Sequence, residues 1–161
     1  MNTLSVQAEP GVPQVVMTRE FDAPRDLVFR AFTEPDLLVQ WLGPRKYVME
    51  IDRYEVRDGG RWRYVHREPD GGAEHWFHGV FHGEPTPDRM VQTFEFEGWP
   101  GPVQMDTATF EERGGRTLVR LNSVFQSVEN RDAMVASGMA EGVREGMDRL
   151  EELLAKLQAN A

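Results

Sequence analysis

The sequence of 161 residues contains no cysteine. This absence excludes a disulfide framework, a thiol nucleophile and a thiolate metal site. Positive charge is also scarce, because 27 Asp and Glu residues stand against 18 Lys and Arg residues and give a formal net charge of −9. Nucleic acids and anionic membranes attract basic surfaces, so we expect neither as a partner.

Long apolar runs are missing too. No stretch approaches the roughly 20 apolar residues that a transmembrane helix needs. The N-terminus lacks a basic region followed by an apolar segment, so we expect no secretory signal peptide and a cytoplasmic location. The serine nucleophile motif G-x-S-x-G is absent, and the D-G-G-R string at 58–61 lacks the lysine of a phosphate loop.

The length suits one domain with a single core. Residues 1–13 are polar and proline-containing, which predicts a flexible tail, and a single domain is then expected over 14–158. Within it, residues 15–22 have the alternating pattern of a first strand. The capping and first-turn residues of a short helix follow at 22–24, and a second short helix is predicted over 35–41.

The middle of the chain has the pattern of consecutive strands separated by short turns rich in glycine, proline and aspartate. Short turns join antiparallel neighbours, so these strands predict a meander. The predicted strands cover 47–56, 61–66, 76–84, 90–97, 104–113 and 117–125.

A long helix is predicted over 132–157, because its apolar residues recur at helical spacing. Gly138, Gly142 and Gly146 lie four residues apart within the apolar stripe. A glycine inside a helix costs ~1 kcal/mol relative to alanine, so three of them indicate either a close approach to a neighbour or space left open. The leucines of the second half indicate ordinary packing. We therefore expect the first half to lie over a more open space.

A meander has one face to bury, and the last helix is the one long apolar helix available to cover it. The sheet must then curl around that helix. The predicted fold is α+β and of the helix-grip type. It consists of a curved antiparallel sheet of six to seven strands wrapped around a long C-terminal helix, with two short helices after the first strand.

Several local strings occur at matching places in this order of elements. They are F-D-A-P at 21–24, W-L-G-P at 41–44, D-G-G-R-W-R at 58–63, H-G-V-F at 78–81, P-T-P-D-R-M-V at 85–91 and S-G-M-A-E-G at 137–142. Together they resemble the START-like (SRPBCC, helix-grip) superfamily, in the branch of the activator of heat-shock-protein-90 ATPase homologue.

The resemblance extends over about residues 15–157 and implies a cavity between sheet and helix that suits a hydrophobic small molecule. The superfamily includes lipid carriers, hormone receptors and polyketide cyclases, so the resemblance does not select one activity. A chaperone partner follows from the family name alone.

An inward aromatic face is predicted for the strand at 61–66. Alternation places Trp62, Tyr64 and His66 on one side of the strand and its arginines on the other, which water should solvate. Opposite the glycine-bearing helix, this face predicts a cavity, although an ordinary filled core remains the alternative. The predicted ligand-binding residues are Trp41, Trp62, Tyr64, His66, Phe77, Phe81, Phe94, Phe96, Met139, Gly142, Val143 and Gly146.

The four histidines raise the question of a metal. His78 and His82 lie on one strand face, where their Cα atoms would be roughly 13 Å apart. Zinc binds histidine nitrogens at about 2.0–2.1 Å, so we predict no metal site. We expect both histidines on the solvent face with Trp76. His66 is expected either at the cavity mouth or as a hydrogen-bonded residue at the edge of the sheet.

The leading functional hypothesis is a non-catalytic module that binds or carries a hydrophobic or aromatic small molecule, with no cofactor. One alternative is an enzyme of the polyketide cyclase or hydrolase type, whose candidate groups are Asp106, His66 and Tyr64. Asp106 would then have a raised pKa if its strand face points inward. Another alternative is a co-chaperone-like protein-interaction domain. The outward Trp76 suggests a homodimer face.

Overall fold

The structure is a computed structural model and describes residues 2–161, so Met1 of the predicted tail lies outside the described residues. The strands are β1 (Ser5–Gln7), β2 (Gln14–Phe21), β3 (Val48–Tyr54), β4 (Arg61–Arg67), β5 (Glu74–Val80), β6 (Arg89–Phe96), β7 (Gln104–Arg113) and β8 (Arg116–Val124). The helices are α1 (Arg25–Thr33), α2 (Pro35–Leu38), α3 (Val128–Ala136) and α4 (Met139–Ala159).

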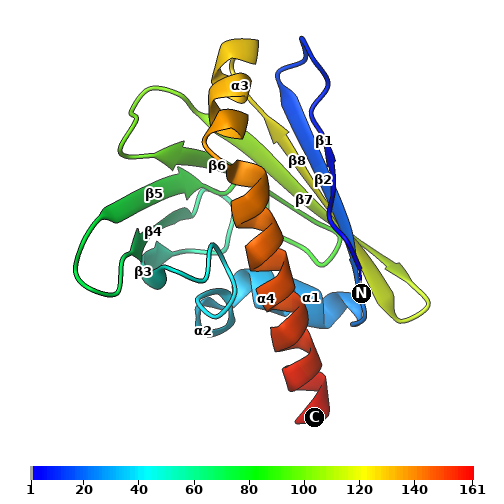
Figure 1. The fold of residues 1–161 in the computed structure, drawn as a ribbon. Helices are drawn as coiled ribbons and strands as arrows, with labels where there is room; N and C mark the ends of the chain where they lie inside the picture. The colour runs from blue at the N-terminus through cyan, green and yellow to red at the C-terminus, as the bar shows by residue number, and fades with distance from the viewer. Residues whose placement is uncertain (1) are drawn as a thin grey trace.

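The strands form one eight-stranded antiparallel sheet in the order β1-β2-β8-β7-β6-β5-β4-β3. From β3 to β8 each strand pairs with the next one in the chain, which is the predicted meander. The sheet curves around α4, which crosses its concave side, while α1 and α2 lie at the end nearer the C-terminus (Figure 1). The predicted α+β helix-grip fold is thereby confirmed.

The N-terminal segment adds one strand beyond the predicted six to seven. β1 pairs with β2 along Ser5↔Thr18, Val6↔Met17 and Gln7↔Val16. The prediction of a flexible tail is therefore wrong for β1. Backbone hydrogen bonds to the edge of β2 hold this segment, and such bonds do not depend on the side-chain pattern. A strand of 3 residues is too short for alternation to be read from the sequence.

The predicted single C-terminal helix is in fact two helices. Gly138 lies between α3 and α4 with φ +92, a left-handed conformation that glycine adopts without steric cost. Ser127 caps the N-terminus of α3, and its side chain accepts a hydrogen bond of 3.0 Å from the backbone N–H of Asn130. The prediction of a continuous helix is wrong here because helical spacing alone does not distinguish a glycine within a helix from a glycine at its start.

The C-terminal half of α4 packs on the main core, beside α1 and the lower part of the sheet. Leu150 and Leu154 are almost fully buried there, among the side chains of Phe21, Val28 and Phe110. This confirms ordinary leucine packing in the second half of the helix and fixes its distance from the sheet.

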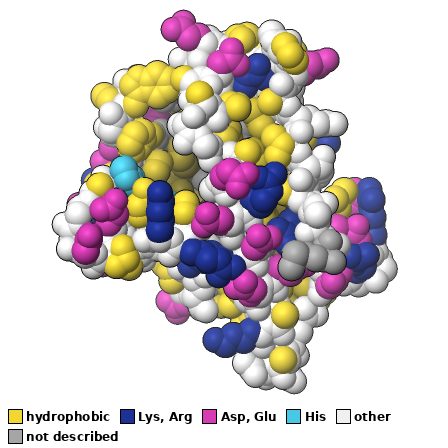
Figure 2. Space-filling view, viewed as in Figure 1, with side chains coloured by type: hydrophobic (Ala, Val, Ile, Leu, Met, Phe, Trp, Pro, Cys, Tyr) yellow, Lys and Arg dark blue, Asp and Glu magenta, His cyan; other side chains and the backbone are white. Residues whose placement is uncertain are grey.

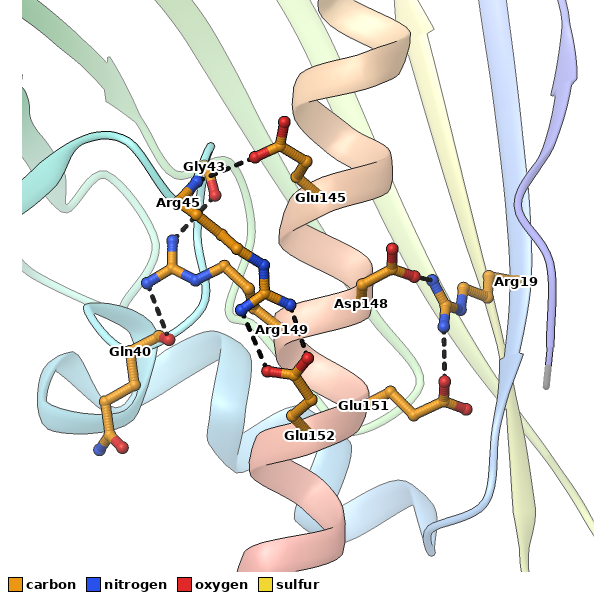
Figure 3. Close-up of polar contacts among 9 residues, drawn as sticks. All are labelled: Arg19, Gln40, Gly43, Arg45, Glu145, Asp148, Arg149, Glu151 and Glu152. Atoms are coloured by element: carbon orange, nitrogen blue, oxygen red, sulfur yellow. Dashed lines mark hydrogen bonds and ion pairs between the residues drawn. The ribbon is translucent and has the colours of Figure 1, made fainter.

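Ion pairs fix one side of α4 to β2. Arg19 on β2 is buried, and its guanidinium contacts Asp148 at 2.6 Å and Glu151 at 2.7 Å (Figure 3). The two carboxylates are partly exposed, so water also solvates them. One buried cation therefore positions two successive turns of the helix.

Hydrogen bonds fix the other side of α4 to the segment after α2. Arg149 donates to the carbonyl oxygens of Gly43 at 2.9 Å and Gln40 at 3.0 Å (Figure 3). Arg45 donates back to α4, from its backbone N–H to Glu145 and from its side chain to Glu152. These contacts place the 40–45 segment against the middle of α4.

Candidate functional site

A cavity of about 640 Å³ lies between the sheet and the first half of α4. Figure 2 shows hydrophobic side chains around a recess beside this helix. Of the predicted ligand-binding residues, all except Trp62 and Phe81 line it: Trp41, Tyr64, His66, Phe77, Phe94, Phe96, Met139, Gly142, Val143 and Gly146.

Trp62 and Phe81 do not line the cavity, so the prediction is wrong for these two residues. Both are almost fully buried in the main core. Gly79 on the neighbouring strand has no side chain, and a Cβ atom built there would lie 2.6 Å from Trp62 Nε1. The Trp62 indole therefore packs over the Gly79 backbone, and Tyr64 stacks on it at 5.1 Å between ring centroids.

The glycines of α4 serve different purposes. A Cβ atom on Gly146 would lie 3.2 Å from Gly43 N and 3.3 Å from Trp41 O, so this glycine permits a close backbone approach. A Cβ atom on Gly142 would meet only Pro44 Cγ, at 3.8 Å. Gly142 therefore leaves space open where the helix crosses the cavity.

Aromatic rings from three adjacent strands form one side of the cavity. Tyr64 on β4, Phe77 on β5 and Phe96 on β6 lie in successive cross-strand pairs. The ring centroid of Phe77 is 5.5 Å from that of Tyr64 and 5.2 Å from those of Phe94 and Phe96. Such spacing is favourable between rings and gives a continuous apolar surface.

His66 lies on the cavity wall beside the backbone of Gly43. Burial lowers the pKa of His66 to about 4, with smaller contributions from His75 and Arg149. Its Nε2 is enclosed and has no hydrogen-bond partner within residues 2–161. Of the two expectations for His66, the structure agrees with the cavity position and not with a hydrogen-bonded edge residue. The neutral imidazole also stacks on Tyr47, at 5.9 Å between centroids.

Polar side chains cross the cavity wall in one line. Gln92 on β6, Asp106 on β7 and Ser123 on β8 occupy directly opposite positions, and we call them the polar row. Gln104 Nε2 donates to Asp106 Oδ1 at 2.7 Å and to Ser123 Oγ at 3.3 Å. The strand face that carries Asp106 therefore points inward, which is the condition stated for a raised pKa.

Burial raises the pKa of Asp106 to about 6, and the hydrogen bonds from Gln104 and Ser123 lower it in part. Desolvation disfavours the carboxylate because the surroundings are mainly apolar. Asp106 keeps a partly accessible surface, and since it lines the cavity, that surface faces the hollow. The cavity thus contains a group that changes its protonation between pH 5 and 7.

Two tyrosines on the wall keep their protons. Burial raises the pKa of Tyr54 above its usual range, and its hydroxyl donates to Phe32 O at 2.6 Å. Burial also raises the pKa of Tyr64, and the nearby Tyr54 and Asp106 add to this shift. Tyr64 is therefore a hydroxyl donor at the cavity and not an anion.

The cavity is also lined by five residues that are not among those predicted from the sequence: Tyr47, Tyr54, Gln92, Gln104 and Ser123. A signal existed for the polar ones. Gln104 and Asp106 share a strand face with apolar Ala108 and Phe110. If the two apolar residues point inward, alternation places the two polar residues inward as well.

The remaining histidines and Trp76 lie outside the cavity, apart from His75 on its wall. His78 contacts Glu97 at 3.0 Å and Glu95 at 3.3 Å on the outer face of the sheet. Trp76 shares that face and is covered by the Arg63 guanidinium at 3.9 Å. In residues 2–161, no three His, Asp or Glu side chains gather as a metal-binding group.

A family model described as "Activator of Hsp90 ATPase homolog 1-like protein" matches residues 22–155. The chain belongs to this family. The match therefore covers all the described elements except β1 and β2, which precede it, and the last residues of α4. Within residues 2–161, no helix is long and apolar enough to cross a membrane.

Solved structures of the same fold agree with this assignment. A protein from Rhodobacter sphaeroides is 26% identical, with a TM-score of 0.86 over 96% of this chain and 99% of that chain. A protein from Arthrobacter aurescens is 26% identical, with a TM-score of 0.86 over 94% of this chain and 91% of that chain. A protein from Mycobacterium smegmatis, at 22% identity and a TM-score of 0.85, shares the fold over 96% of this chain and 97% of its own. A comparison with curated proteins gave no significant match.

Proposed function

We propose that this chain binds a hydrophobic or aromatic small molecule in the cavity between the sheet and α4, as a carrier or receptor module. The observation that carries the proposal is the cavity itself. Its volume of about 640 Å³ falls within the 300–1,000 Å³ that is usual for ligand sites. Its lining is mainly aromatic and aliphatic, with a few polar groups on one line, which is the usual composition of such sites.

The conformational cost of Gly142 supports the same proposal. Gly142 is the fourth residue of α4, and a glycine in a helix sacrifices at most ~1 kcal/mol of stability relative to alanine. No neighbour outside the helix forces this choice, because a Cβ atom there would meet only Pro44 Cγ at an ordinary distance. The missing side chain enlarges the cavity, so ligand space explains a residue that folding alone does not require.

Methionines give the cavity an adaptable lining. Met134 on α3 and Met139 and Met147 on α4 all line it. Methionine has three rotatable bonds and a polarisable sulfur, and therefore fits apolar molecules of different shapes. The part of the wall formed by these helices can accommodate several related ligands, while the sheet supplies rigid aromatic rings.

Fluorescence titration with N-phenyl-1-naphthylamine, a neutral aromatic probe, tests the proposal. We expect saturable binding to the native chain and about tenfold weaker binding to Gly142→Phe, because the new ring occupies the cavity. Ala155→Phe is the matched control, since Ala155 is exposed on the same helix outside the cavity. Equal binding by all three proteins, or none by the native chain, refutes the proposal, provided that circular dichroism shows each protein folded.

Proton-transfer catalysis on the bound molecule is a second candidate function, and one observation favours it. Asp106 has a pKa of about 6 and lines the same cavity as Tyr64, whose hydroxyl keeps its proton. Perturbed groups of this kind occur at catalytic sites. Mass spectrometry after incubation with aromatic esters and polyketide-like substrates tests it. Turnover that disappears in Asp106→Asn supports catalysis, and unchanged substrates in every incubation remove its support.

A further inference from the structure

Asp106 is a carboxylic acid on a cavity wall that carries no cation. The lining residues in the described part of the chain include no lysine, no arginine and no second carboxylic acid. The other titratable groups facing the cavity are Tyr47, Tyr54, Tyr64, His66 and His75. An ionised Asp106 therefore has hydrogen-bond donors but no counter-ion.

A buried carboxylate without a counter-ion is unfavourable, and hydrogen bonds offset this only in part. Gln104 Nε2 donates to Asp106 Oδ1 at 2.7 Å, and the same NH2 group also donates to Ser123 Oγ at 3.3 Å. Asp106 still exposes surface to the hollow. A ligand that brings a positive charge to this point would complete the environment of the carboxylate.

The aromatic rings next to Asp106 favour the same kind of ligand. Phe94 lies opposite Gln104, and Gln92 lies opposite Asp106, so Phe94 is a diagonal neighbour of the carboxylate on the sheet. Phe77 and Tyr64 continue the ring surface away from it. Ring faces carry negative partial charge and attract organic ammonium groups, and aromatic cages bind quaternary ammonium in this way.

We propose that the ligand is an organic ammonium ion with an apolar body, and that Asp106 and the adjacent aromatic rings hold its cationic group. This inference rests on the proposed function and specifies its ligand class. Other observations agree with it. Burial lowers the pKa of His66 to about 4, so His66 supplies no competing positive charge at neutral pH. The net charge of −9 also attracts cations to the protein surface.

A charge series on one aromatic body tests the inference by isothermal titration calorimetry at pH 8. The probes are trimethyl(1-naphthylmethyl)ammonium, the neutral 1-naphthylmethanol and the anionic 1-naphthoate. We expect the ammonium to bind about ten- to hundredfold more tightly than the alcohol, as for an interaction with a charged partner. We expect the naphthoate to bind most weakly, because it places a second negative charge beside Asp106.

Asp106→Asn removes the charge and keeps the size of the side chain. In this variant we expect the ammonium probe to bind no more tightly than the alcohol probe. Asp52→Asn is the matched control, because it changes the net charge equally at a partly exposed outer-face residue that does not line the cavity. It should retain the full preference.

The possible results separate the two proposals. Equal affinity for ammonium and alcohol in the native chain overturns the inference and leaves the proposed function standing. A preference that persists in Asp106→Asn also overturns it. If none of the probes binds the native chain, both proposals fail. The comparison between probes in the native chain does not depend on the folding of any variant.

Discussion

Gly142 lies beside Pro44 on the cavity wall, and a Cβ atom on Gly142 would lie 3.8 Å from Pro44 Cγ with no other contact outside its own helix. One turn later, the same construction on Gly146 meets backbone atoms at 3.2 Å and 3.3 Å. Two glycines of one helix therefore have opposite surroundings. The α4 backbone is close-packed at Gly146 and open at Gly142.

This contrast predicts opposite effects of alanine at the two sites. Gly142→Ala should raise the free energy of unfolding by at most ~1 kcal/mol, because alanine favours the helix and its methyl group fits. Gly146→Ala should lower it by about 1 kcal/mol, since crowding costs of roughly 1–3 kcal/mol exceed the helix gain. Urea unfolding of both variants measures the difference. A higher free energy of unfolding in both variants would contradict the close backbone approach at Gly146.

Because Asp106 is buried, we expect the free energy of unfolding to fall as pH rises and this group ionises. Its pKa is about 6 in the folded chain and 3.8 ordinarily, so the folded state holds the proton more tightly. The cost of ionising Asp106 therefore appears between about pH 4 and pH 6 and amounts to roughly 3 kcal/mol at most. Asp106→Asn should be more stable than the native chain at pH 8 and about equal at pH 4. Guanidinium unfolding across this range measures the difference, and a constant difference would refute the burial of a titrating Asp106.

The burial of His66 should have the opposite effect and make the folded chain less stable as pH falls. Its pKa is lowered from 6.5 to about 4, so its contribution to stability is complete above pH 6.5 and is lost as pH falls toward 4. The loss amounts to roughly 3 kcal/mol at most. His66→Gln, which cannot titrate, should lack this loss. Thermal unfolding of variant and native chain from pH 4 to 7 tests this, and parallel curves would show that His66 is not buried as a neutral group.

Replacing Arg19 should cost less stability than replacing its two carboxylate partners. Arg19→Met leaves Asp148 and Glu151 partly exposed and solvated, so we expect a loss of about 1–2 kcal/mol. The double variant Asp148→Asn and Glu151→Gln leaves a buried guanidinium without an anion, and we expect a loss of roughly 3–5 kcal/mol. Chemical unfolding compares the two. Equal losses would mean that water reaches Arg19 in the folded chain.

Periodicity was sufficient to predict the fold and the inward faces of several of its elements. Alternation in the strand at 61–66 correctly directed Tyr64 inward, and helical spacing placed Met139, Gly142 and Val143 on the face of α4 toward the sheet. These predictions succeed because period-2 and period-3.6 patterns report which face is buried.

Other features depended on contacts that a one-dimensional pattern does not contain. Trp62 shares its strand face with Tyr64 but fills the space above Gly79, so its burial depends on a glycine in another strand. The left-handed conformation of Gly138 ends one helix and begins another without changing the spacing of apolar residues. The β1 segment is held by backbone pairing, which is likewise absent from the side-chain pattern.

The most direct test of ligand binding in the cavity is a titration of the ¹⁵N-labelled chain with 1-naphthylmethanol, followed by amide chemical shifts. Saturable shifts should concentrate at the cavity wall, around Tyr64, Phe94, Asp106 and Gly142, and spare the outer-face residues Arg63 and Glu97. Shifts scattered over the outer face, or none at millimolar probe, would contradict a ligand site between the sheet and α4.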